Sequence, residues 1–166
     1  MTPKEFKKTY WPDIEAVCRE TGLNPLFVAA QAALETGWGE SAIGNNLFGI
    51  TAGDKWTGAV QTVRTFEYFG DDQQGYRFNK VYSITRTRDG RYKYTVDRAF
   101  RDYTSVRDCL LDHSRVLMRK RYAPAMPYKD DVYQFAYWIA ACGYCTAKPG
   151  DYAGLLLKLA KMIEKA

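Results

Sequence analysis

The chain has 166 residues, of which 46% are hydrophobic and 26% are charged, so it fits a single folded domain and is not intrinsically disordered. The net charge of +5 is uneven, because residues 1–75 carry 6 Lys or Arg and 10 Asp or Glu, whereas residues 76–166 carry 18 and 9. A basic half suits an anionic polymer, such as nucleic acid, bacterial cell wall or an anionic glycan. No stretch has the length of a membrane span or the apolar region of a secretory signal, which predicts a soluble protein made in the cytoplasm.

The first elements are predicted to be helical. Residues 4–21 carry apolar side chains at helical spacing, and Gly22 ends this pattern. Asn24 followed by Pro25 predicts an N-cap and the first residue of a second helix. The segment 26–36, LFVAAQAALET, is apolar on almost every side and is therefore predicted to be buried.

The middle of the chain has strand character. Many Gly, Thr, Tyr and Phe residues occur between positions 44 and 94, and apolar residues alternate over 60–68, 82–86 and 91–96. The last two stretches flank an Asp89-Gly90 turn signal. The pattern predicts a small antiparallel β-lobe inserted into a helical domain.

Helical periodicity returns after residue 104 and predicts helices near 105–119, 130–142 and 150–165. The predicted fold class is therefore α+β and mainly helical, with a small β-lobe or hairpin. Cys142 and Cys145 form a C-x-x-C motif at the end of the second of these helices, which is a poor context for a redox pair. A single His113 does not complete a zinc ligand set, so neither a metal nor an organic cofactor is expected.

Glu35 is the most anomalous residue in the chain. It lies near the C-terminal end of the predicted buried helix, four residues after Gln31 and on the same face. Apolar surroundings and the negative end of the helix dipole both favour the protonated form, as a general acid near neutral pH requires. The alternative is a core glutamate paired with a nearby cation or backbone amide.

The loop after Glu35 reads GWGESAIGNNLFGI, which supplies backbone amides and two asparagines. Flat apolar faces lie nearby at Trp38, Phe48 and Trp56. Such a mixture can bind a sugar polymer through ring stacking and hydrogen bonds to hydroxyl or acetamide groups. The alternative is that the glycines form turns and the aromatic residues belong to the core.

Five ordered blocks carry a resemblance to a known family. They are AQAALETGWG at 30–39 with NNLFGI at 45–50, WTG at 56–58, TFEY at 65–68, FRDYTS at 100–105 and GYCT at 143–146. Together they resemble glycoside hydrolase family 73, which includes the glucosaminidase domains of autolysins and a flagellar muralytic domain. The resemblance covers residues 10–165.

The resemblance implies one catalytic domain over residues 1–166, with a lysozyme-like α-lobe at about 1–43 and 104–166 and a β-lobe at about 50–100. It implies cleavage of peptidoglycan at the N-acetylglucosaminyl-β-1,4-N-acetylmuramic acid linkage. Glu35 then matches the general acid, Glu67 a second carboxylate and Tyr144 a tyrosine facing the substrate. Spacing alone would make Glu67 a surface charge on an edge strand. Substrate contacts are expected from Gln31, Trp38, Asn45, Asn46, Phe48, Trp56, Tyr68 and Tyr103.

Two departures from the family pattern stand out. Ala147 follows Tyr144-Cys145-Thr146, where the family often has Asp, and Asp151 is the next acid in the chain. The segment 76–96 is predicted to be an enlarged, basic hairpin, which wraps the glycan, contacts wall anions or only protects exposed strand edges.

Two mechanisms and two other functions stay open. Glu67 acts as base if it lies roughly 6.5–9.5 Å from Glu35, and otherwise the substrate acetamide attacks the anomeric carbon. The other functions are a lysozyme-like muramidase and a non-catalytic module that binds glycan or nucleic acid. The leading prediction is a monomeric enzyme on peptidoglycan, without a nucleic-acid partner or membrane insertion. It would act at the wall after release or export, as a phage lysin, a secreted effector or an autolysin fragment.

Overall fold

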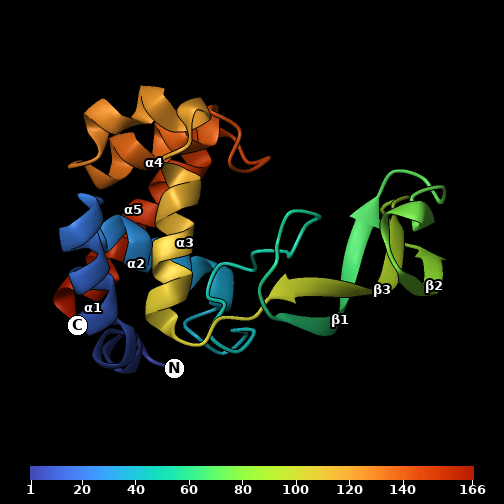
Figure 1. Cartoon of the computed structure of the whole chain (residues 1–166). Helices are drawn as coiled ribbons and strands as arrows, with labels where there is room; N and C mark the ends of the chain where they lie inside the picture. The colour runs from blue at the N-terminus through green and yellow to red at the C-terminus, as the bar shows by residue number, and fades with distance from the viewer. The chain divides into compact units, whose positions relative to one another are not determined.

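A computed structural model describes all residues from 1 to 166, and the chain divides into two compact units. The helical unit comprises residues 1–49 and 103–166, and the sheet unit comprises residues 50–102 (Figure 1). The predicted α+β, mainly helical class with a small antiparallel sheet is confirmed.

The helical unit is built from five α-helices and a 3-10 segment. Within it, α2 packs against α5, α1 and α4, while α1 also contacts α3 and α4 contacts α5. None of the helices is long and apolar enough to cross a bilayer. The elements are α1 (Pro3–Thr21), α2 (Pro25–Thr36), α3 (Val106–Leu117), η2 (Lys120–Tyr128), α4 (Val132–Ala141) and α5 (Pro149–Lys165).

The start and end of α2 follow from local chemistry. The Asn24 side chain accepts hydrogen bonds from the backbone N–H groups of Leu26 and Phe27, at 3.0 and 3.3 Å, and Pro25 occupies the first turn. Gly37 ends the helix in the left-handed conformation, with a φ of 54° that glycine adopts without steric cost. These two signals fix where Glu35 sits, one residue before the end of α2.

The sheet unit contains three antiparallel strands in the order β1-β3-β2. They are β1 (Val60–Phe69), β2 (Lys80–Arg86) and β3 (Tyr92–Arg101). In the β1–β3 register, Glu67 lies opposite Tyr94 and Phe66 lies opposite Thr95. Successive side chains of a strand point to opposite sides of a sheet, so Glu67 and Phe66 mark its two faces, called here the Glu67 face and the Phe66 face.

The Glu67 face carries the core of the sheet unit. Tyr94 is fully buried there, and its ring lies 5.1 Å from the ring of Phe69 and 6.3 Å from that of Phe78. The Tyr94 hydroxyl donates to the carbonyl of Asp71 at 2.9 Å and accepts from the N–H of Gln74 at 3.1 Å. The segment between β1 and β2, which includes η1 (Gly75–Arg77), is therefore fastened to this face.

The predicted helices and strands are confirmed, and the largest differences lie at β3 and η2. β3 continues to Arg101, well past the predicted end at residue 96, because its pairing with β1 extends along the whole of that strand. The segment η2 was not predicted, since Pro124 and Pro127 interrupt any regular helical pattern.

Candidate active site

Glu35 combines an exposed position with a perturbed pKa. The rest of α2 is largely buried, but Glu35 itself is on the exposed side of the last turn. The surrounding protein nevertheless removes enough water from the carboxyl group to raise its pKa above the usual value. An accessible carboxylic acid with a raised pKa is suited to donating a proton to a substrate.

Three tyrosines lie together in the helical unit near Glu35. The ring of Tyr144 is 6.3 Å from the rings of Tyr122 and Tyr152. Burial raises the pKa of Tyr144 and of Tyr152, and the negative charge of Glu35 contributes to both shifts. Both hydroxyl groups therefore stay protonated at neutral pH, so Tyr144 is equipped to donate a hydrogen bond rather than to act as a nucleophile.

A buried hydrogen-bond chain supports this cluster. The amide group of Gln31 donates from Nε2 to the Tyr152 hydroxyl at 2.7 Å, and its Oε1 lies 2.8 Å from His113 Nε2. Because an amide oxygen only accepts hydrogen bonds, His113 Nε2 carries the proton. Gln31 is fully buried and engaged at both ends. These hydrogen bonds let Gln31 position Tyr152 and His113, and the substrate contact expected from Gln31 stays a prediction.

His113 is neutral in the folded protein because burial lowers its pKa from 6.5 to about 3. As the pH falls below 6.5, the unfolded chain binds a proton that the folded chain does not. This group should therefore reduce the free energy of unfolding by up to about 1.4 kcal/mol per pH unit until the folded form titrates. Urea unfolding of wild type and His113→Phe at several pH values isolates the contribution, because the variant should lack this slope. Identical slopes would contradict it.

The asparagine loop is built on buried contacts. Asn45 donates from Nδ2 to the carbonyl of Tyr103 at 2.8 Å, and the Tyr103 hydroxyl donates to Asp112 at 2.6 Å. The ring of Phe48 stacks on His113 with 3.6 Å between centroids. Asn46, Phe48 and Tyr103 are buried, so they support the loop, and the sugar contacts expected from these three side chains stay predictions.

The two predicted tryptophan contacts lie in different units. Trp38 is held in the helical unit, where its ring meets Phe6 edge-on at 5.6 Å and its backbone adopts a φ of 62°. Trp56 belongs to the sheet unit and donates from its indole nitrogen to the carbonyl of Ala59 at 2.9 Å. Both rings are partly exposed and stay candidates for substrate contacts.

Glu67 is held by a partner that the sequence did not reveal. Arg98 on β3 donates from Nη1 to Glu67 Oε1 at 2.6 Å, on the Glu67 face. Arg98 lies two residues beyond the predicted end of the last strand at residue 96. If the alternation of faces along that strand is continued, it places Arg98 on the same face as Tyr94. Tyr68 points to the Phe66 face, the side of the sheet opposite Glu67, and its contact with the substrate stays a prediction.

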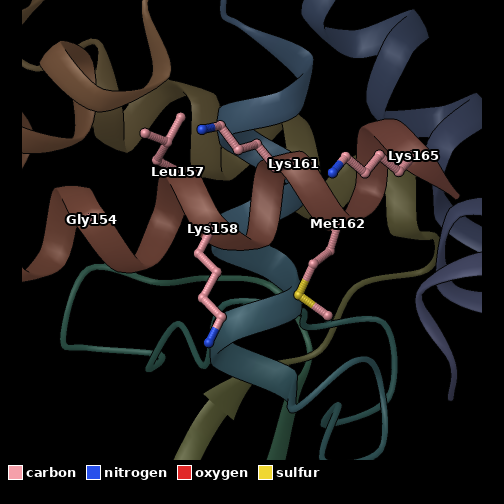
Figure 2. Close-up of a pocket in the computed structure, with 6 residues that line it drawn as sticks. All are labelled: Gly154, Leu157, Lys158, Lys161, Met162 and Lys165. Carbon is pink, nitrogen blue, oxygen red and sulfur yellow. The ribbon is translucent and has the colours of Figure 1, made fainter.

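Other groups do not add to this site. A depression of about 400 Å³ lies on α5 and is lined by lysines and apolar side chains, as Figure 2 shows. It contains no carboxylate, so it offers no acid for catalysis. No group of three or more His, Cys, Asp or Glu side chains is arranged to hold a metal ion, and all four cysteines are free.

Comparison with solved structures places the fold among glycoside hydrolase domains. The chain superimposes on the glycoside hydrolase domain of Salmonella typhimurium FlgJ with a TM-score of 0.72 at 25% identity, covering 99% of this chain and 90% of that one. It superimposes on a peptidoglycan hydrolase from Sphingomonas sp. A1 with a TM-score of 0.64 at 30% identity, covering 96% and 86%.

Residues 11–165 match the family described as mannosyl-glycoprotein endo-beta-N-acetylglucosaminidase, and the chain belongs to this glucosaminidase family, glycoside hydrolase family 73. A relative in sequence is the peptidoglycan hydrolase FlgJ of Vibrio parahaemolyticus, 30% identical over 98% of this chain. The match covers 48% of that protein, and the corresponding share is 36% for FlgJ of Pseudomonas aeruginosa. The chain thus spans less than half the length of these relatives.

Proposed function

We propose that this protein hydrolyses the glycan strand of peptidoglycan at the linkage between N-acetylglucosamine and N-acetylmuramic acid. The observation that supports the proposal most strongly is Glu35, an exposed acid with a raised pKa at the end of a buried helix. Family membership supports the glucosaminidase specificity, and the FlgJ relatives support peptidoglycan as the substrate. The protein would accordingly act at the bacterial cell wall.

Glu35 is the proposed general acid. Its proton passes to the glycosidic oxygen as the bond to the anomeric carbon breaks, so the leaving sugar departs as a neutral alcohol. Tyr144 is proposed to hydrogen-bond the substrate beside this acid, because its hydroxyl stays protonated and lies within the electrostatic reach of Glu35. Trp38, Asn45 and Trp56 are proposed to contact the sugars.

Two routes complete the reaction. In the first, Glu67 accepts a proton from water as that water attacks the anomeric carbon, which inverts the configuration. In the second, the acetamide oxygen of the substrate attacks the anomeric carbon as Glu35 protonates the leaving oxygen. Water then opens the cyclic intermediate and gives its proton to the ionised Glu35, and the two displacements together retain the configuration. We favour the second route, in which Glu67 and Arg98 contribute by orienting the acetamide or the water. NMR of fresh product would show the β-anomer first for this route, whereas an initial α-anomer would favour Glu67 as base.

Product analysis tests the linkage that is cut. Purified sacculi are digested, the soluble fragments are reduced with borohydride, and their masses are determined. The proposal predicts that each new reducing end is a reduced N-acetylglucosamine. Reduced N-acetylmuramic acid would instead identify a muramidase. If the sacculi bind the protein but release no fragments, the chain is a wall-binding module and the proposal is wrong.

A further inference from the structure

The Phe66 face of the sheet carries exposed aromatic side chains. Phe66 and Tyr68 on β1 are 53% and 45% exposed, and Tyr82 on β2 is 38% exposed. The segment between β1 and β2 covers the opposite face, where Tyr94 is buried. The rings of Phe66, Tyr68 and Tyr82 therefore do not belong to the core of the sheet unit. Several partly exposed aromatic side chains on one sheet face are typical of a binding surface.

Cations lie directly over these rings. The Arg64 guanidinium is 3.6 Å from the ring centroid of Tyr82, and the Lys93 ammonium is 3.8 Å from that of Phe66. Lys80 lies 4.7 Å from the Tyr82 ring on the same face. The rings therefore hold three cations in place on the surface.

Little negative charge opposes these cations. The strand register places one carboxylate, that of Asp97, on the Phe66 face, and the Tyr82 hydroxyl donates to it at 2.8 Å. Arg91 also approaches this face, 4.9 Å from the Tyr68 ring, but it is paired with Asp89 at 2.8 Å. The Phe66 face thus presents more positive than negative charge, interleaved with apolar rings.

We infer that the Phe66 face is a second peptidoglycan-binding surface, separate from the residues proposed to cleave the strand. Peptidoglycan combines pyranose rings, whose C–H faces pack on aromatic rings, with carboxylates on its lactyl and peptide groups, which complement Arg64, Lys80 and Lys93. Glu67 points to the other side of the same sheet, so the Phe66 face is separate from the Glu67 carboxylate. This inference rests on the proposed function for the identity of the polymer.

Such a surface would hold the enzyme on an insoluble substrate between cleavage events. A second contact on the same polymer raises the local concentration of glycan around the catalytic residues without changing the chemical step. Loss of the surface should therefore weaken retention on sacculi while leaving the cleavage of short soluble fragments unchanged.

The test compares two double variants that lose the same charge. Arg64→Gln/Lys93→Gln removes two cations from the Phe66 face, and Lys161→Gln/Lys165→Gln removes two from α5 (Figure 2). Binding to sacculi is measured by sedimentation in a Glu35→Gln background, so that digestion does not interfere. Phe66→Ser is measured beside them to test the aromatic contribution. Hydrolysis of a soluble disaccharide-peptide tetramer is measured with Glu35 intact.

The first double variant should raise the apparent Kd for sacculi about tenfold, Phe66→Ser several-fold, and the α5 variant less than twofold. Soluble cleavage should stay within twofold of wild type in all of them. Sacculi whose carboxylates have been amidated should bind wild type as weakly as the first double variant. If both double variants lose the same affinity for sacculi, binding depends only on the net charge of the protein, and the inference is overturned.

Two further outcomes would also overturn it. Binding of sacculi that is unchanged in the first double variant would show that the Phe66 face makes no contact with the wall. Binding to phosphatidylglycerol vesicles that depends on Arg64 and Lys93, with sacculi unaffected, would assign the face to an anionic lipid surface. Failure of the proposed function would be separate, because wild type would then leave the soluble tetramer uncut whatever the sedimentation result.

Discussion

Glu35→Gln is expected to reduce the rate of peptidoglycan hydrolysis by about 10²–10⁴-fold, the usual contribution of a general acid. The amide preserves the shape of the side chain but has no proton to donate to the leaving oxygen. The release of soluble fragments from sacculi measures the loss, and sedimentation should show that the variant still binds them. Glu15→Gln on α1 is the matched control, since it removes an exposed carboxylate elsewhere and should retain full activity.

The same substitution has a signature in stability. Because the pKa of Glu35 is raised in the folded protein, the ionised form is less favourable there than in the unfolded chain. The contribution of the Glu35 carboxyl group to the free energy of unfolding is therefore fully present below the pKa of the unfolded chain. It is lost as the pH rises through the pKa of the folded protein. Glu35→Gln should accordingly unfold at the same or a higher temperature than wild type at pH 7, and the difference should vanish below a pH of about 4. A lower unfolding temperature at pH 7 would show that Glu35 stabilises the fold and is not held there for chemistry.

Gln31→Met is expected to lower the free energy of unfolding by about 2–4 kcal/mol. Methionine fills a similar volume but leaves the His113 N–H and the Tyr152 hydroxyl without their hydrogen bonds in a buried site. Urea unfolding at pH 7 measures the loss. Gln73→Met is the control, because Gln73 is exposed and its loss should change stability by less than about 0.5 kcal/mol.

If Gln31→Met is as stable as wild type, the buried hydrogen bonds of Gln31 with Tyr152 and His113 do not stabilise the fold as proposed. The variant should also reduce hydrolysis, since Tyr152 packs 6.3 Å from Tyr144 and its displacement would disturb that ring. This activity loss should be smaller than that of Glu35→Gln, because the loss of Gln31 reaches the Tyr144 ring through Tyr152 and leaves the proposed acid in place.

The helices and strands could be predicted because their signals are local. Asn24, Pro25 and Gly37 mark the ends of α2 through capping and backbone preferences, and this placed Glu35 in the final turn. The alternation along β1 and the Asp89-Gly90 turn likewise predicted the hairpin. The family motifs then pointed to Glu35, Glu67 and Tyr144 as candidates.

The depth of individual side chains could not be predicted in this way. Gln31, Asn46 and Phe48 occur in the motif beside Glu35, and a motif does not distinguish a residue that contacts substrate from one that supports it. The chain Tyr152–Gln31–His113 joins residues as far apart as 121 positions in sequence, so no local pattern encodes it. Arg98 was missed for a different reason, since the length of β3 depends on its partner strand.

The leaving-group dependence of Glu35→Gln tests the central claim most directly. Wild type and variant are compared on N-acetylglucosamine oligosaccharides that carry either a sugar or a dinitrophenyl leaving group. A dinitrophenolate departs without protonation, so the account predicts a loss of at least about 10²-fold on the sugar leaving group and a loss below tenfold on the aryl one. Equal losses on both substrates, or no loss on either, would contradict Glu35 as the general acid.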